Sequence, residues 1–106
     1  MVSESENTGI SLTTTQEPPR AALQRAVSAM KAGNPDAAEN ICRGQLKLNP
    51  GNVDHLRLLG HALMEQRRFD EAEEQLKVAI DFAPDYAPLS EDLGSALAQQ
   101  HKLEEA

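Results

Sequence analysis

The sequence predicts an all-α protein built of antiparallel helix pairs. Between residues 53 and 84, leucines and alanines recur at spacings of three and four in two short stretches, which places them on one face of each of two helices. Arg67–Arg68 separates the two stretches, and Asp70 and Glu71 open the second helix, where negative charge suits the free backbone N–H groups. Pro84 ends that helix. Aromatic residues are only 3% of the chain, which favours aliphatic helix packing over a sheet sandwich.

A glycine inside the first of these helices indicates that the two helices cross closely. Gly60 costs roughly 1 kcal/mol relative to alanine in a helix interior, so a neighbour that leaves no room for a side chain would explain it. Ala72 is small and early in the second helix, and it is the expected partner. The sequence therefore predicts a hairpin that is tightly packed at one end.

The same hairpin recurs along the chain at a fixed offset. Leu59–Gly60 returns as Leu93–Gly94, and Pro50 returns as Pro84, each after 34 residues, the period of tetratricopeptide repeats. The segments LLGHAL and FDEAEEQLKVAIDFAP are similar to the first and second halves of that repeat motif. The chain thus resembles the tetratricopeptide repeat family. The resemblance implies a right-handed α-solenoid of antiparallel helix pairs, with about two and a half repeats.

The repeat register divides the chain into a leader and one domain. Residues 1–19 are rich in Ser, Thr and Glu and lack periodicity, so we expect a disordered leader. Residues 20–106 form the predicted repeat domain. Its repeats are expected at about 19–52, 53–86 and 87–106, the last one truncated.

The ends of the helices can be predicted in the first and third repeats. In the first, Gly33 stops a helix over residues 20–32, and Asn34 caps the next helix, which has Pro35 at its first position. In the third, His101–Lys102 is the expected turn, after which residues 103–106 begin a second helix. Because that helix is incomplete, we expect Leu93 and Leu97 to be partly exposed.

Composition and charge exclude several classes of partner. The formal net charge of −7 argues against non-specific binding to nucleic acid or to an anionic membrane surface. Cys42 is the only cysteine, so no intrachain disulfide can form, and its register position predicts that it packs inward. The chain has neither a membrane-length apolar run nor the features of a secretory signal. We expect a cytoplasmic protein.

Residues arranged for catalysis are not apparent in the sequence. The chain has no Gly-rich phosphate loop and no hydrolase or zinc-protease motif. His55 and His61 do not share a helix face, so they are poor candidates for a metal pair, and Glu73–Glu74 is typical of a solvated helix surface. We therefore expect no enzyme activity, no catalytic residue, no metal and no cofactor.

The resemblance implies a binding surface instead. In tetratricopeptide repeats, the first helices of successive repeats line a concave groove that takes extended or helical peptides. The register places the following residues in that groove: Leu23, Gln24, Val27, Met30 and Lys31 from the first repeat, Asp54, Arg57, Leu58, His61, Met64 and Glu65 from the second, and Glu91, Asp92, Ser95, Ala98 and Gln99 from the third. The sequence thus predicts an interaction module with a protein or peptide partner.

One subtype of the family is disfavoured. Repeats that clamp an acidic C-terminal peptide carry Lys, Asn and Arg at set groove positions. The matching positions here hold Leu23, Val27, His61, Pro88 and Asp92. Only His61 could become cationic, and Asp92 would repel a carboxylate.

Two other functions remain open from the sequence. The chain could be the leading repeat region of a larger enzyme, similar to bacterial sulfotransferases and glycosyltransferases that begin with such repeats. Alternatively, copies of the chain could associate through the open end of the third repeat, where Leu93, Leu97 and Leu103 lie.

Overall fold

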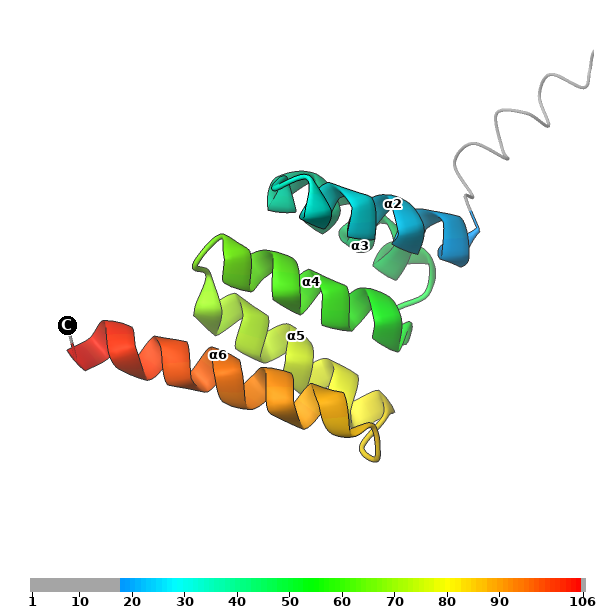
Figure 1. Ribbon diagram of the computed structural model, residues 1–106. Coiled ribbons are helices and arrows are strands. Elements are labelled where there is room, and N and C mark those ends of the chain that lie inside the picture. Colours follow the sequence, from blue (N-terminus) through cyan, green and yellow to red (C-terminus); the bar gives the residue numbers. More distant parts are fainter. Residues whose placement is uncertain (1–17, 106) are drawn as a thin grey trace, which may run out of the picture.

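The computed structural model describes residues 18–105, which contain five helices and no strand (Figure 1). The helices are α2 (Pro19–Lys31), α3 (Pro35–Leu48), α4 (Val53–Glu65), α5 (Phe69–Phe82) and α6 (Ala87–Glu105). The predicted disordered leader lies outside the described residues, apart from its last two positions. Of these, Pro19 is the first residue of α2 and belongs to the folded domain.

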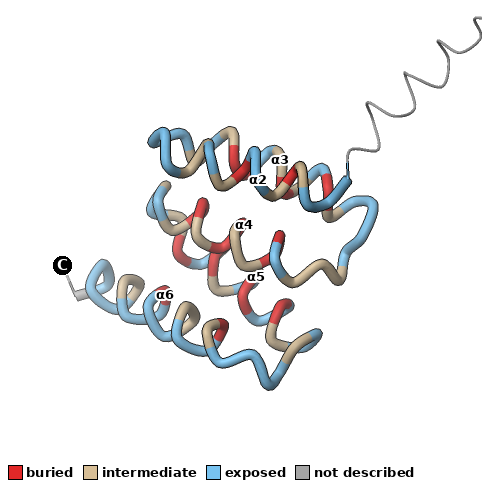
Figure 2. Tube along the Cα trace, turned by 45° about the vertical axis from the view of Figure 1, so that its right-hand side comes forward, coloured by how far each residue is buried: buried red, intermediate tan, exposed pale blue. Residues whose placement is uncertain are grey.

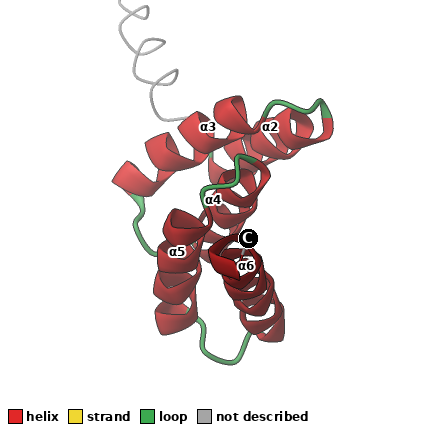
Figure 3. Ribbon diagram, turned by 90° about the vertical axis from the view of Figure 1, so that its left-hand side faces the viewer, coloured by secondary structure: helices red, strands yellow, loops and turns green. Residues whose placement is uncertain are grey.

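The helices form two layers. Figure 3 shows α3 and α5 on one side of the molecule and α2 and α6 on the other. Each helix packs against the next one in sequence, and α4 also contacts α2 and α6. The first helices of the repeats therefore lie beside one another, and the second helices lie behind them. This arrangement confirms the predicted helical solenoid.

The hairpin turns share one backbone conformation. Gly33 and Arg67, which are 34 residues apart, both have positive φ, at 77° and 63°. In both turns the next residue donates its backbone N–H five residues back, from Asn34 to Ala29 at 2.8 Å and from Arg68 to Leu63 at 2.9 Å. Such a left-handed residue followed by a back-reaching hydrogen bond satisfies carbonyl groups at a helix end.

The predicted helix caps are confirmed at the first hairpin. The side chain of Asn34 accepts a hydrogen bond from the backbone N–H of Ala37 at 3.3 Å, and Pro35 is the first residue of α3. Asn52 caps α4 in the same way, accepting from His55 at 3.2 Å. These caps fix where each helix begins.

The close crossing at Gly60 is confirmed, but its predicted partner is wrong. A Cβ atom on Gly60 would lie 3.0 Å from both Cγ and Cδ2 of Leu76. Ala72 is buried one turn earlier in α5 and is not the residue in closest contact. A helical side chain leans toward the start of its own helix, so the longer leucine fills the space opposite the glycine.

The predicted turn at His101–Lys102 is also wrong, because α6 continues through both residues to Glu105. A turn here would place His101 in the left-handed conformation of Gly33 and Arg67, which costs an L-residue about 1–2 kcal/mol. Each residue added to α6 gains a backbone hydrogen bond without a new nucleation step, which favours continuation of the helix.

Aliphatic side chains between the two layers make up the core (Figure 2). Leu59, Leu63 and Leu76 are fully buried there, and Cys42 is buried as predicted. Burial raises the pKa of the Cys42 thiol to about 12, so this cysteine stays protonated. In α6, Leu97 is 44% exposed and Leu93 is half-buried, so both are partly exposed as predicted.

Candidate interaction surface

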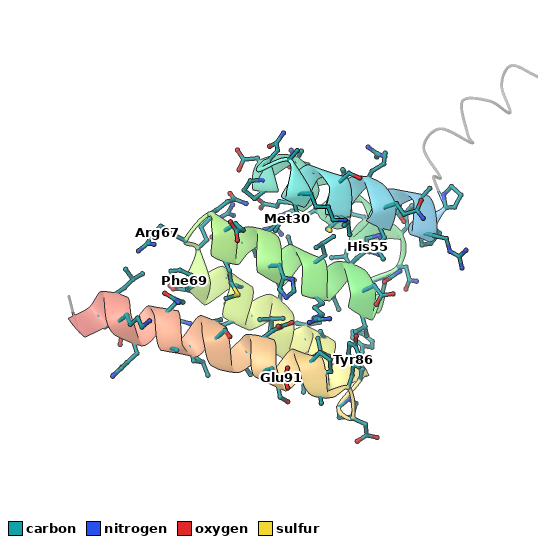
Figure 4. The ribbon with its side chains drawn as sticks, viewed as in Figure 1. Met30, His55, Arg67, Phe69, Tyr86 and Glu91 are labelled. Atoms are coloured by element: carbon teal, nitrogen blue, oxygen red, sulfur yellow. The ribbon has the colours of Figure 1, made fainter. Side chains whose placement is uncertain are left out.

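The outer face of α2, α4 and α6 carries most of the residues predicted to line the groove, and we call it the first-helix face. It is turned toward the viewer in Figure 4. A hollow of about 180 Å³ lies on it between α2 and α4, here called the α2–α4 hollow. Its lining residues are Leu23, Val27, Asp54, Arg57, Leu58 and His61. All six belong to the predicted set.

A cluster of charged side chains links α4 to α6 at the edge of this hollow. Arg57 donates from Nε to Oδ2 of Asp92 at 2.5 Å, and Nε2 of His61 lies 2.9 Å from the same oxygen. The Arg57 guanidinium also lies 5.8 Å from the centre of the Tyr86 ring. Burial opposes ionisation of Asp92, but the hydrogen bonds from Arg57 and His61 outweigh it and keep its pKa below the usual value.

This cluster changes the interpretation of Asp92. From the sequence, the Asp92 carboxylate was expected to be free to repel an acidic peptide. In the structure it has two hydrogen-bond partners, Arg57 and His61. Residues at neighbouring register positions on adjacent first helices lie side by side. Since Arg57 plus one repeat is Glu91, the repeat register could have suggested the pairing with the adjacent Asp92.

A second hollow of about 390 Å³ lies where α4 ends, here called the α4–α6 hollow. Its lining residues are Met64, Glu65, Arg67, Phe69 and Gln99. Three of them belong to the predicted set, whereas Arg67 and Phe69 were not predicted. The guanidinium of Arg67 lies 5.8 Å from the centre of the Phe69 ring, so the turn residue with positive φ also packs over the start of α5.

The remaining predicted residues lie outside these two hollows. Gln24 lines a separate hollow with Ile41 and neighbouring residues at the first-repeat end of the molecule. Met30, which is labelled in Figure 4, is half-buried and packs against the core. The others are exposed on α2 or α6, namely Lys31, Glu91, Ser95 and Ala98.

A polar network on the other side of α4 joins the first repeat to the second. Glu39, which is 9% exposed, accepts hydrogen bonds from Gln66 at 3.0 Å, Arg68 at 2.8 Å and Arg43 at 2.8 Å. Arg68 also pairs with Glu71 at 2.6 Å. Burial opposes ionisation of Glu39, but its three donors outweigh it and lower its pKa to about 2.

Part of this network returns 34 residues later. Glu73 accepts from Gln100 at 2.7 Å and pairs with Lys77 at 2.6 Å. These three residues are the register equivalents of Glu39, Gln66 and Arg43. The prediction that Glu73 is a solvated carboxylate is therefore wrong, since it holds α5 to α6. Applying the repeat period to polar as well as apolar positions would have revealed this pairing.

The histidines do not form a metal site among the described residues. His55 is buried, and neither ring nitrogen has a hydrogen-bond partner there. Burial lowers its pKa, so the ring is neutral at neutral pH. Residues 18–105 hold no group of three or more His, Cys, Asp or Glu side chains that could bind a metal ion. Over the same residues, every helix is too short or too polar to span a membrane.

Comparison with known proteins agrees with the repeat register. A family model described as tetratricopeptide repeat matches residues 29–99, which is more than half of the 106-residue chain. A search among curated proteins finds no significant match. Repeats of this kind are helical modules that generally mediate protein–protein interaction and are typically non-catalytic. The chain belongs to the tetratricopeptide repeat family.

Proposed function

We propose that this chain is a scaffold that binds a peptide or helix of a partner protein along its first-helix face. The observation that carries the proposal is the α2–α4 hollow, in which Leu23, Val27 and Leu58 provide apolar surface beside polar side chains. Pockets for small molecules usually have volumes of about 300–1,000 Å³. A hollow of about 180 Å³ suits a single apolar side chain of a partner better than a whole small ligand.

The arrangement of the helices supports a partner that runs across the repeats. The α2–α4 and α4–α6 hollows both border α4, so one segment lying on the first-helix face could place a side chain in each. Recognition through apolar anchors at helical spacing is a common way for a groove to bind an amphipathic helix. We infer a non-catalytic, cytoplasmic scaffold with protein partners. Its net charge of −7 disfavours nucleic acid and anionic membranes as partners.

Binding to selected peptides tests this function. Peptides of about 15 residues would be selected on the whole chain from a random display library, and their Kd measured by fluorescence anisotropy. Replacing Leu58, which lines the α2–α4 hollow, by glutamine is expected to weaken binding by about tenfold or more, because the hollow loses apolar surface that would contact a side chain of the peptide. Val27→Gln should have the same effect.

The matched control is Val78→Gln on the opposite layer. Val78 is 39% exposed and lines a hollow between α3 and α5, so its replacement removes apolar surface without touching the first-helix face. Thermal melts of all variants would show that they stay folded. Binding that survives Leu58→Gln and Val27→Gln but is lost in Val78→Gln would move the function to the other face.

A second candidate function is self-association, which the exposed end of α6 favours. Leu97 and Leu103 are 44% and 46% exposed there. We expect light scattering over a concentration series to show a dimer that Leu97→Glu weakens by about tenfold, because a carboxylate would be buried between the copies. A molar mass that stays that of a monomer at every concentration would rule out this candidate.

A further inference from the structure

Two basic side chains of the first-helix face are already engaged within the molecule. Arg57 and His61 both bind Oδ2 of Asp92, so neither is available as a free anchor for an acidic partner. Within the part of the chain that the structure describes, Asp54, Glu65 and Glu91 have no ion-pair partner, and they are exposed. The free charge of the predicted binding residues is therefore predominantly negative, with Lys31 as the one exposed cation among them.

Two of these carboxylates line the hollows. Asp54 lines the α2–α4 hollow together with Leu58, and Glu65 lines the α4–α6 hollow together with Met64 and with Arg67, whose guanidinium packs over the Phe69 ring. Because α4 rises about 1.5 Å per residue, the backbones at positions 54 and 65 are roughly 16 Å apart along its axis. Glu91 adds a third carboxylate on the exposed side of α6 (Figure 4).

The geometry points to a basic amphipathic helix as the partner segment of the first-helix face. Its apolar side chains would occupy the two hollows, and its lysines or arginines would pair with Asp54, Glu65 and Glu91. The chain's net charge of −7 adds a long-range attraction for such a segment. This inference rests on the proposed function, because it names the chemistry of the partner that the same surface binds.

Two designed probe peptides test the inference. Both have about 15 residues and leucines at positions i, i+3, i+4 and i+7 of a helix, and their polar positions are all lysine in one and all glutamate in the other. Affinities for the whole chain would be measured by fluorescence anisotropy at low and high salt. We expect the lysine peptide to bind about tenfold or more tightly than the glutamate peptide, and its advantage to shrink at high salt.

A pair of triple variants separates local pairing from the net charge. The first-helix variant combines Asp54→Asn, Glu65→Gln and Glu91→Gln. The control variant combines Asp36→Asn, Asp70→Asn and Glu74→Gln, which removes the same charge from exposed positions of α3 and α5. The first-helix variant should weaken binding of the lysine peptide about tenfold, and the control less than about threefold.

The outcomes distinguish failure of the inference from failure of the proposed function. Equal loss in both triple variants, or no binding of the lysine peptide, would overturn the inference. A glutamate peptide that binds more tightly and is weakened by Leu58→Gln would also overturn it, while leaving the binding face in place. A lysine peptide that is sensitive to the first-helix triple variant but not to Leu58→Gln or Val27→Gln would support the charge pairing and contradict the apolar seat of the proposed function.

Discussion

Replacing Gly60 by leucine is expected to lower the free energy of unfolding by about 3 kcal/mol, at the upper end of the usual cost of overpacking. The first atom added, Cβ, would already lie 3.0 Å from two side-chain atoms of Leu76. Leu76 is fully buried and cannot move into solvent, so α4 and α5 would have to separate. Urea unfolding followed by the helical circular dichroism signal would measure the loss.

Gly94 offers a matched control for this prediction, because it occupies the same register position one repeat later. A Cβ atom on Gly94 would have no neighbour within 4 Å. Gly94→Leu should therefore be neutral or stabilise the protein by up to about 0.8 kcal/mol through helix propensity alone. Equal stability of the Gly60 and Gly94 variants would show that α4 and α5 do not cross closely at Gly60.

Acidification is expected to weaken the junction between the first two repeats. The pKa of Glu39 is about 2 in the folded protein, against an ordinary value of 4.5. A carboxyl group with a lowered folded-state pKa contributes stability that is complete above the unfolded value and is lost as the pH falls through the folded one. We expect about 2 kcal/mol to disappear between pH 5 and pH 2, since the exposure of Arg43 lets water screen part of the interaction.

Glu39→Gln isolates this contribution from the other titrating groups. At neutral pH the variant should be less stable than the parent by about 2 kcal/mol, because its neutral amide replaces a carboxylate that accepts from three donors. Urea midpoints of the two proteins should converge as the pH approaches 2. Glu74→Gln changes an exposed carboxylate on the same layer and should track the parent at every pH. A difference in urea midpoint between Glu39→Gln and the parent that does not change with pH would contradict a contribution from the charged carboxylate.

The fold could be predicted from the sequence because the repeat period acts on many residues at once. The spacing of Leu59, Gly60 and their equivalents fixes which helix faces meet, and Asn34 with Pro35 fixes where a helix begins. Periodicity assigns a residue to a face, however, and does not say how far its side chain reaches. For that reason the sequence identified Ala72 rather than Leu76 as the neighbour of Gly60.

The residues that line the α2–α4 hollow could be predicted from the repeat register, whereas the hydrogen bonds between side chains of the first-helix face were not predicted. The α2–α4 hollow contains only residues that the register had placed on the first-helix face. The repeat register places Arg57 beside Glu91 and Asp92, but which of the two carboxylates it contacts depends on the lateral offset between α4 and α6, which a one-dimensional period does not contain. The straight course of α6 likewise depends on a competition between a strained turn and helix continuation, which the repeat pattern alone does not decide.

The polar network around Glu39 has a consequence for how a partner is recognised. Sliding one repeat past the next by a helical turn would take Gln66 and Arg68, which lie in the turn between α4 and α5, away from the buried carboxylate of Glu39, which is costly. Only one alignment of the two repeats is therefore favourable, and it sets the shape of the face that we propose as the binding surface. A surface whose repeats are held in one alignment loses little conformational entropy when it binds, so most of the entropy lost on binding comes from ordering the partner segment.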